Sequence, residues 1–218
     1  MDESNALLRS TRQLLGLLLQ HPREFYGRVA VQVGFRMEQL VAENLFGRPP
    51  QYETVSWEKL LQDMEARFDG IADILEEPAL GTIEKRVRQL YADIRKELVG
   101  DPEWGADLTV ARCCYLACRL LKPSVVVEGG VSYGVSSAFI LQALKENDHG
   151  TLYSLDLPSL RPNFEKFWGI AVPEELKGRW ELYRGYSRHV LPKILRETEK
   201  VDVFVSDTLF IPWPPAGP

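Results

Sequence analysis

Residues 124–137, SVVVEGGVSYGVSS, contain the residue types best suited to hold a small molecule. An apolar run ends at the acid Glu128 and continues into a turn with Gly129, Gly130 and Gly134, after which the pattern becomes helical. Glycines let the backbone approach a ligand, and the free N–H groups at a helix start point towards it. The segment therefore predicts a strand, a glycine turn and a helix that together cradle a ligand. An ordinary strand-to-helix turn that binds nothing is the alternative.

The spacing of the glycines selects among ligand cradles. A dinucleotide fingerprint ending at Gly134 needs a glycine at position 131, which is Val131. A phosphate-binding P-loop needs a lysine at position 135, which is Val135. The pattern that fits is an acid followed by Gly130 and Gly134. An acid at the end of the strand disfavours a phosphate, but it suits a ligand that carries an ammonium group or hydroxyls.

A second acid follows the next predicted strand. The segment TLYSLDLP (151–158) alternates into a short strand that ends at Asp156. In a βαβ unit this position lies at the carboxyl end of the neighbouring strand, beside the glycine turn. A carboxylate there can accept two hydrogen bonds from a ribose diol. The alternative is an acid that caps a turn or helix ahead of Pro158.

Four segments in the correct order resemble class I S-adenosylmethionine-dependent methyltransferases, in the branch of small O-methyltransferase-like and cephalosporin-hydroxylase-like domains. They are VVVEGGVSYGVSSAFILQAL, LYSLDLP, VPEELKGRWELYRGYSRHVLP and VDVFVSD, and the resemblance covers about residues 105–208. It implies S-adenosyl-L-methionine as the cofactor. It also implies methyl transfer to a hydroxyl of a small metabolite or sugar as the activity, with that small molecule as the partner.

The resemblance also implies which residues contact the cofactor. In this family the first motif holds the methionine end, the acid after the second strand holds the ribose, and the turn after the third strand lines the adenine pocket. In the same order, these residues are Glu128, Gly129, Gly130, Gly134 and Ser136; then Asp156; then Gly185, Tyr186 and Ser187. Many relatives have a small residue, Pro or Asp where this chain has Tyr186, and an aromatic ring there can stack on adenine.

The acid that ends VDVFVSD, Asp207, is the candidate catalytic residue. In related O-methyltransferases an acid here lies beside the transferred methyl group as a base or metal ligand. Alignment and removal of the acceptor's proton can supply most of the acceleration of an in-line methyl transfer. The relatives carry His-Asp-Ser-x-His at this place, whereas this chain has SDTLF (206–210), so no metal site is predicted. A strand-end acid that caps the next turn is the alternative.

The family's fifth strand and terminal hairpin have no counterpart before Pro218. The expectation is therefore a C-terminally truncated domain, incomplete after its fourth strand, which would then be a sheet edge. The proline-rich tail, the N-terminal helices or a second copy of the chain, in a homo-oligomer, could cover that edge. Two other functions stay open: a catalytically inactive cofactor-binding fragment or pseudoenzyme, and an NAD-dependent Rossmann enzyme.

Two regions of the chain differ in pattern. Residues 1–104 indicate an N-terminal helical region, with helices near 5–20, 24–46, 56–75 and 83–99. Residues 105–218 indicate a Rossmann-like α/β domain, with strands near 124–128, 151–156, 180–184 and 201–206 and helices near 108–121, 135–146, 164–168 and 187–198. Such alternation predicts a parallel sheet with right-handed crossovers, whose ligands lie outside the carboxyl ends of the strands.

The composition of the chain argues against some classes of binding partner and favours one cellular compartment. The formal net charge is −5 and no long basic run occurs, which argues against a nucleic-acid surface. No apolar stretch reaches the roughly 18 residues of a membrane span, and no signal-peptide pattern is present. Cys113, Cys114 and Cys118 crowd one predicted helix as apolar fillers, which favours a reducing, cytoplasmic setting.

Overall fold

The computed structural model describes residues 15–22, 24–30, 33, 55–97, 107–158 and 164–207. The chain divides into two compact units, the first made of Met1–Thr54, Pro158–Glu165 and Thr208–Pro218, and the second of Val55–Leu157 and Lys166–Asp207. Every residue predicted to belong to the site falls in the second unit. The predicted domain boundary between residues 104 and 105 stays a prediction.

In the first unit, residues 15–20, 22, 24–30 and 33 are helical. The side chain of Arg28 is buried, and its guanidinium pairs with Glu24 one turn earlier and with Glu165, 2.8 Å away. The ion pair with Glu165 joins segments that are far apart in the sequence. The remainder of the two helices predicted near 5–20 and 24–46 lies outside the described residues.

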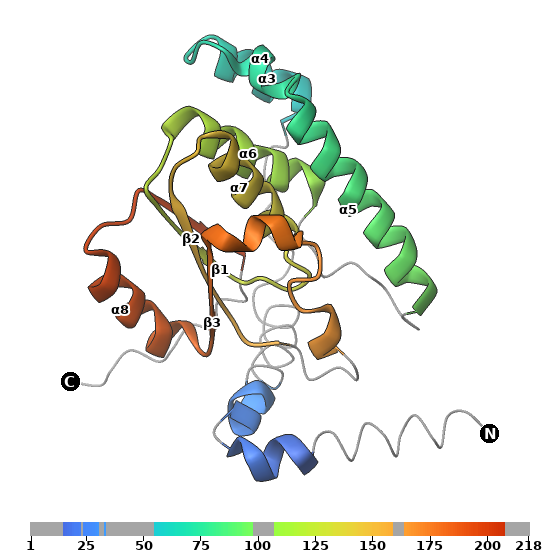
Figure 1. The fold of residues 1–218 in the computed structure, drawn as a ribbon, viewed down its shortest axis with the longest axis vertical. Helices are drawn as coiled ribbons and strands as arrows, with labels where there is room; N and C mark the ends of the chain where they lie inside the picture. Colours follow the sequence, from blue (N-terminus) through green and yellow to red (C-terminus); the bar gives the residue numbers. More distant parts are fainter. Residues whose placement is uncertain are drawn as a thin grey trace, which may run out of the picture. The chain divides into compact units, whose positions relative to one another are not determined.

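The second unit is built around a four-stranded parallel sheet (Figure 1). Its strands are β1 (Val125–Gly129), β2 (Thr151–Asp156), β3 (Trp180–Arg184) and β4 (Val203–Ser206). Their order in the sheet is β3-β2-β1-β4, so β4 lies at one edge of the sheet formed by the described strands. This architecture confirms the predicted Rossmann-like α/β fold.

Helices pack on the strands and explain the apolar character of β1. Helix α8 (Ser187–Thr198) covers one face, where Ile194 contacts Val127 and Leu155. Helices α6 (Leu108–Leu121) and α7 (Val135–Glu146) pack against each other, and α7 also packs against β2. Side chains alternate along a strand, so a parallel sheet covered on both faces needs apolar residues at successive positions. Figure 1 shows α8 set apart from α6 and α7 around the strands.

The helix predicted over residues 56–75 is in fact two helices. Helix α3 (Trp57–Glu65) begins at Ser56, whose hydroxyl accepts a hydrogen bond from the Lys59 N–H at 3.2 Å. Helix α4 (Ile71–Leu75) follows Gly70, which has a φ of 80°. A residue in the left-handed region cannot be part of a right-handed helix, so α4 starts as a separate helix after Gly70.

Helix α5 (Pro78–Glu97) begins five residues before the helix that the sequence predicts near 83–99. Proline suits the first helical position, because the N–H that it lacks would have no partner within the helix. Ion pairs join this part of the chain to α6: Arg112 pairs with Glu84, and Arg119 pairs with Glu77. Hydrogen bonding to these glutamates raises the pKa of both arginines. Among the described residues, no helix is both long enough and apolar enough to cross a membrane.

Candidate functional site

Residues just beyond the carboxyl ends of the strands lie along one edge of the sheet. Next to β3 and β2, the Gly185 N–H donates a hydrogen bond to the Asp156 carbonyl oxygen at 3.0 Å. Next to β4 and β1, the Asp207 N–H donates to the Gly129 carbonyl oxygen at 2.9 Å. The structure therefore brings the four predicted strand ends together, as the parallel topology requires.

The turn between β1 and α7 depends on its glycines. Gly130 has a φ of 90° and Gly134 a φ of 79°, values that residues with a Cβ atom rarely adopt. Gly134 is also crowded, because a Cβ there would lie 2.9 Å from the Cα of Gly169. Ser132 takes the same left-handed conformation with a φ of 49°. The two glycines of the predicted motif thus stand where the backbone needs them.

Glu128, the acidic residue of β1, is completely buried (0% exposed). Its Oε1 accepts a hydrogen bond from the Ser136 hydroxyl at 2.6 Å. Its Oε2 accepts from the hydroxyls of Ser137 at 2.5 Å and Ser154 at 2.7 Å. Burial raises the pKa of Glu128, and the three serine hydroxyls oppose that rise by stabilising the carboxylate. The side chain ties β1 to the first turn of α7 and to β2.

Two of these serines were not singled out from the sequence. Ser154 pairs with Glu128 in the β1–β2 register and also accepts a hydrogen bond from the indole N–H of Trp180 at 2.8 Å. Ser137 follows the predicted contact residue Ser136 on α7. The signal available in the sequence for Ser154 was a serine among apolar residues of the predicted strand. Its partner became clear only from the pairing of the two strands.

Asp156, at the end of β2, is half-buried and accepts three hydrogen bonds. Its Oδ2 accepts from the Ser132 N–H at 2.9 Å and from the Trp168 indole N–H at 3.0 Å. Its Oδ1 accepts from the Leu157 N–H at 2.7 Å. The carboxylate therefore holds the glycine turn against the end of β2. The predicted neighbourhood of this acid and the turn is present in the structure.

A segment that begins at Trp168 runs across the glycine turn. The Gly169 N–H donates to the Ser132 carbonyl oxygen at 2.9 Å, and the Ala171 N–H donates to the Tyr133 carbonyl oxygen at 2.8 Å. The segment follows the 3₁₀ helix η1 (Phe164–Phe167), close to the helix predicted near 164–168. The guanidinium of Arg184, at the end of β3, lies 5.6 Å from the centre of the Trp168 ring, a cation–π distance.

The remaining predicted residues follow β3 and β4. Tyr186 is half-buried, and its ring packs edge-on against His189 with centroids 6.1 Å apart. The Arg188 guanidinium lies 5.2 Å from the centre of the same ring. Ser187 is exposed as the first residue of α8, and Asp207 is exposed after the last residue of β4.

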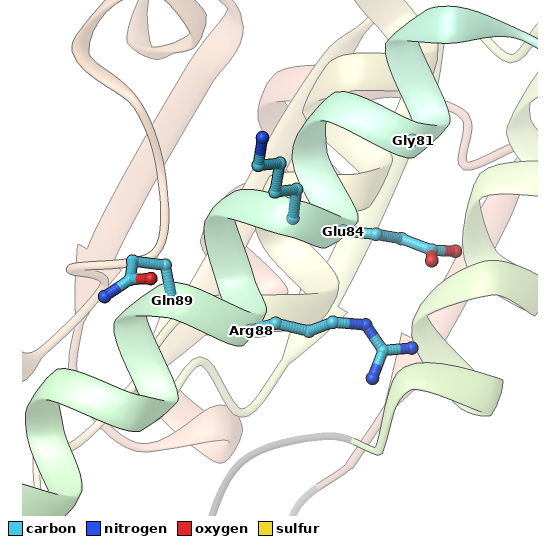
Figure 2. Close-up of a pocket in the computed structure, with 5 residues that line it drawn as sticks. Gly81, Glu84, Arg88 and Gln89 are labelled. Atoms are coloured by element: carbon cyan, nitrogen blue, oxygen red, sulfur yellow. The ribbon is translucent and has the colours of Figure 1, made fainter.

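A shallow cavity lies away from these residues, on helix α5 (Figure 2). Its lining is Gly81, Glu84, Lys85, Arg88 and Gln89. Figure 2 shows Glu84 and Arg88 pointing to the same side of the helix. Because one helix alone lines this cavity, it lacks the convergent groups of a ligand site. In the part of the chain that the structure describes, no group of three or more His, Cys, Asp or Glu side chains could hold a metal ion.

Comparison with known families supports the resemblance seen in the sequence. Residues 127–210 match the model of a family described as a methyltransferase domain. This segment contains the last three residues of β1, the glycine turn and all of β2, β3 and β4, and the match confirms the predicted resemblance over it. No curated protein matches the sequence.

Solved methyltransferases are similar at low identity. The O-methyltransferase TomG from Streptomyces achromogenes is involved in tomaymycin synthesis and was solved with SAM. It is 20% identical to this chain, the match covers 61% of this chain and 54% of TomG, and the TM-score is 0.43. For the O-methyltransferase from Bacillus cereus, solved with SAH, the identity is 16%, the match covers 82% of this chain and 63% of that protein, and the TM-score is 0.41. For the SAH-bound methyltransferase PaMTH1 from Podospora anserina, the identity is 14%, the match covers 72% of this chain and 62% of PaMTH1, and the TM-score is 0.40. The chain spans less than two thirds of each of these proteins.

Proposed function

We propose that this chain, whose residues 127–210 match a methyltransferase-domain family, binds S-adenosyl-L-methionine at the carboxyl edge of its sheet and methylates an oxygen of a small molecule. One observation carries the proposal. The hydrogen bond from the Ser132 N–H to Asp156 Oδ2, 2.9 Å long, holds the proposed ribose acid against the turn that contains Gly130 and Gly134.

The residues at this edge fit the cofactor's parts. Gly130 has no side chain to obstruct a ligand beside the turn, and the N–H groups at the start of α7 favour a carboxylate. We place Glu128 and Ser136 at the methionine end together with Gly129. In the conformation described, the buried Glu128 carboxylate holds the first turn of α7 through Ser136, so its contribution is to position the N–H groups of that turn.

Asp156 and the turn before α8 would hold the nucleoside. Carboxylate oxygens offer about four acceptor positions, and three donors already occupy those of Asp156, which leaves one position on Oδ1 for a ribose hydroxyl. We place Tyr186 and Ser187 at the adenine, because Gly185 connects their turn to the end of β2.

Proton removal from the acceptor is the proposed task of Asp207. The bound cofactor supplies a methyl group on a positively charged sulfur. Asp207 is exposed next to Gly129, where its carboxylate can take the proton that a metabolite or sugar hydroxyl loses as its oxygen gains the methyl group. Alignment of that hydroxyl would supply much of the remaining acceleration.

The setting and the assembly complete the proposal. We propose a reducing, cytoplasmic environment, because Cys114 and Cys118 are free and buried, and burial raises the pKa of both thiols to about 12.

For the edge of the sheet at β4, where Phe204 is 54% exposed, we propose that a second copy of the chain covers the strand.

Calorimetric titration with S-adenosylhomocysteine and, separately, with NAD tests the cofactor. We expect saturable binding of S-adenosylhomocysteine and none of NAD, because Val131 breaks the dinucleotide spacing. Transfer of a radiolabelled methyl group to a panel of small hydroxyl compounds then tests the activity. Preference for NAD would indicate a dinucleotide enzyme, and cofactor binding without transfer to any compound would indicate an inactive cofactor-binding protein.

A further inference from the structure

We propose that the indole N–H of Trp168 occupies a ribose-binding position on Asp156 in the free protein, and that the cofactor must displace it to bind. Trp168 would then set the affinity of the site by competing with the ligand for one carboxylate. The inference rests on the proposed function and adds to it a residue outside the glycine motif.

The hydrogen bonds of Asp156 carry the argument. A ribose diol offers two hydroxyl donors to a carboxylate, but only one acceptor position of Asp156 remains, on Oδ1. Binding of both hydroxyls therefore requires that one present donor leaves. The Trp168 bond, at 3.0 Å, shares Oδ2 with the Ser132 N–H.

The three donors differ in their freedom to leave. Leu157 follows Asp156 directly, so its N–H cannot move away without a change in the backbone at the end of β2. Ser132 is held from its other side, because its carbonyl oxygen accepts the Gly169 N–H at 2.9 Å. The Trp168 donor belongs to a side chain, which can rotate about two bonds while its backbone stays in place.

The surrounding backbone keeps this motion local. The bonds from the Gly169 and Ala171 N–H groups fasten the segment to the glycine turn. The close approach of Gly134 to Gly169 leaves no room for even one added carbon between them. Arg184 lies over the Trp168 ring at 5.6 Å and pairs with Asp156 in the β2–β3 register. Within the part of the chain that the structure describes, the indole makes one hydrogen bond and one cation–π contact, and rotation of the side chain can break both.

Trp168→Phe tests the competition because it keeps an aromatic ring and removes the N–H donor. We expect the Kd for S-adenosylhomocysteine, measured by calorimetry, to fall about three- to tenfold, the net scale of one ordinary hydrogen bond. Trp57→Phe is the matched control, since Trp57 lies on α3 against Arg112, and its Kd should equal that of the wild type. An unchanged or raised Kd in Trp168→Phe would overturn the inference.

The unaltered protein offers a second readout, for which the variant serves only to assign a signal. The indole N–H signal of Trp168 in a nitrogen–proton correlation spectrum, assigned by its loss in Trp168→Phe, should move on saturation with S-adenosylhomocysteine, while that of Trp57 stays. A Trp168 signal that stays fixed at saturation would overturn the inference and leave the proposed function intact. Failure of S-adenosylhomocysteine to bind both wild type and Trp168→Phe would overturn the proposed function and this inference with it.

Discussion

The ends of β1 and β2 are built differently from the end of β4. At β1 and β2, Glu128 and Asp156 each accept three hydrogen bonds from their own chain, and Glu128 is completely buried. At β4, Asp207 is exposed and Phe204 is 54% exposed. The acids at the ends of β1 and β2 hold the surrounding backbone through hydrogen bonds, whereas the acid at the end of β4 faces solvent.

Acids at equivalent strand ends therefore need not serve the same purpose. A buried carboxylate with several donors shapes the loop around it, and losing it leaves those donors without a partner. An exposed carboxylate exchanges protons freely and contributes little to stability. We therefore expect substitutions at β1 and β2 to affect folding and cofactor binding, and substitutions at β4 to affect turnover and association.

The largest effect is expected from Glu128→Ala. The change leaves three buried serine hydroxyls without their acceptor and opens a cavity, so the free energy of unfolding should fall by about 2–4 kcal/mol. Chemical denaturation followed by circular dichroism measures it. Glu128→Gln is the control, because an amide of the same shape still accepts from serine, and it should lose less. Equal stability of Glu128→Ala and wild type would refute the structural role of this acid.

Asp207→Asn should lower the rate of methyl transfer about 10²-fold or more, because the amide cannot accept the proton of the acceptor hydroxyl. The Kd for S-adenosylhomocysteine should stay the same, since the substitution lies outside the glycine turn. Radiolabelled transfer measures the rate and calorimetry measures the affinity. A rate equal to that of the wild type would remove Asp207 from catalysis.

Asp156→Ala should weaken binding of S-adenosylhomocysteine by about 1–3 kcal/mol, the scale of charge-assisted hydrogen bonds. The matched control is Asp148→Ala. Asp148 is an exposed acid that lies just before β2 and pairs with Arg179. Calorimetry of both variants separates a local effect from a general change in charge. If Asp156→Ala binds as tightly as the control, the ribose contact is elsewhere.

Burial of Glu128 predicts a dependence of stability on pH. Because burial raises the pKa of this acid above its ordinary value of 4.5, the folded protein binds the proton more tightly than the unfolded chain does. The free energy of unfolding should therefore fall as the pH rises from about 4.5 through the raised value in the folded state. Glu128→Gln should lack this part of the decline in denaturation curves recorded across that range. Parallel profiles for the two proteins would contradict a raised pKa.

The smallest effect on stability is expected from Phe204→Lys at the open edge. An exposed side chain contributes little, so the free energy of unfolding should change by no more than about 0.5 kcal/mol. If a second copy covers β4, the substitution should shift the protein towards monomers in sedimentation velocity. A wild type that is already monomeric at high concentration would exclude that cover.

Local patterns predicted the sheet and its three flanking helices well. The apolar run before Glu128 and the helical pattern after Gly134 correspond to β1 and α7 almost residue for residue. The run over residues 56–75 was predicted as one helix, because Gly70 can be tolerated within a helical pattern and only its backbone conformation shows the break. The sequence placed Asp156 beside the glycine turn, because a βαβ unit brings neighbouring strand ends together.

The parallel sheet, the glycine turn and the acids at the strand ends follow from local sequence, since each depends on the order of residues within one short segment. The hydrogen-bond donors that those acids meet follow from the packing of remote segments. Ser154 reaches Glu128 through strand pairing, and Trp168 reaches Asp156 through a segment that crosses the turn. A hydrogen bond needs its two atoms within about 3 Å, and such a distance between remote residues is set by packing rather than by local pattern.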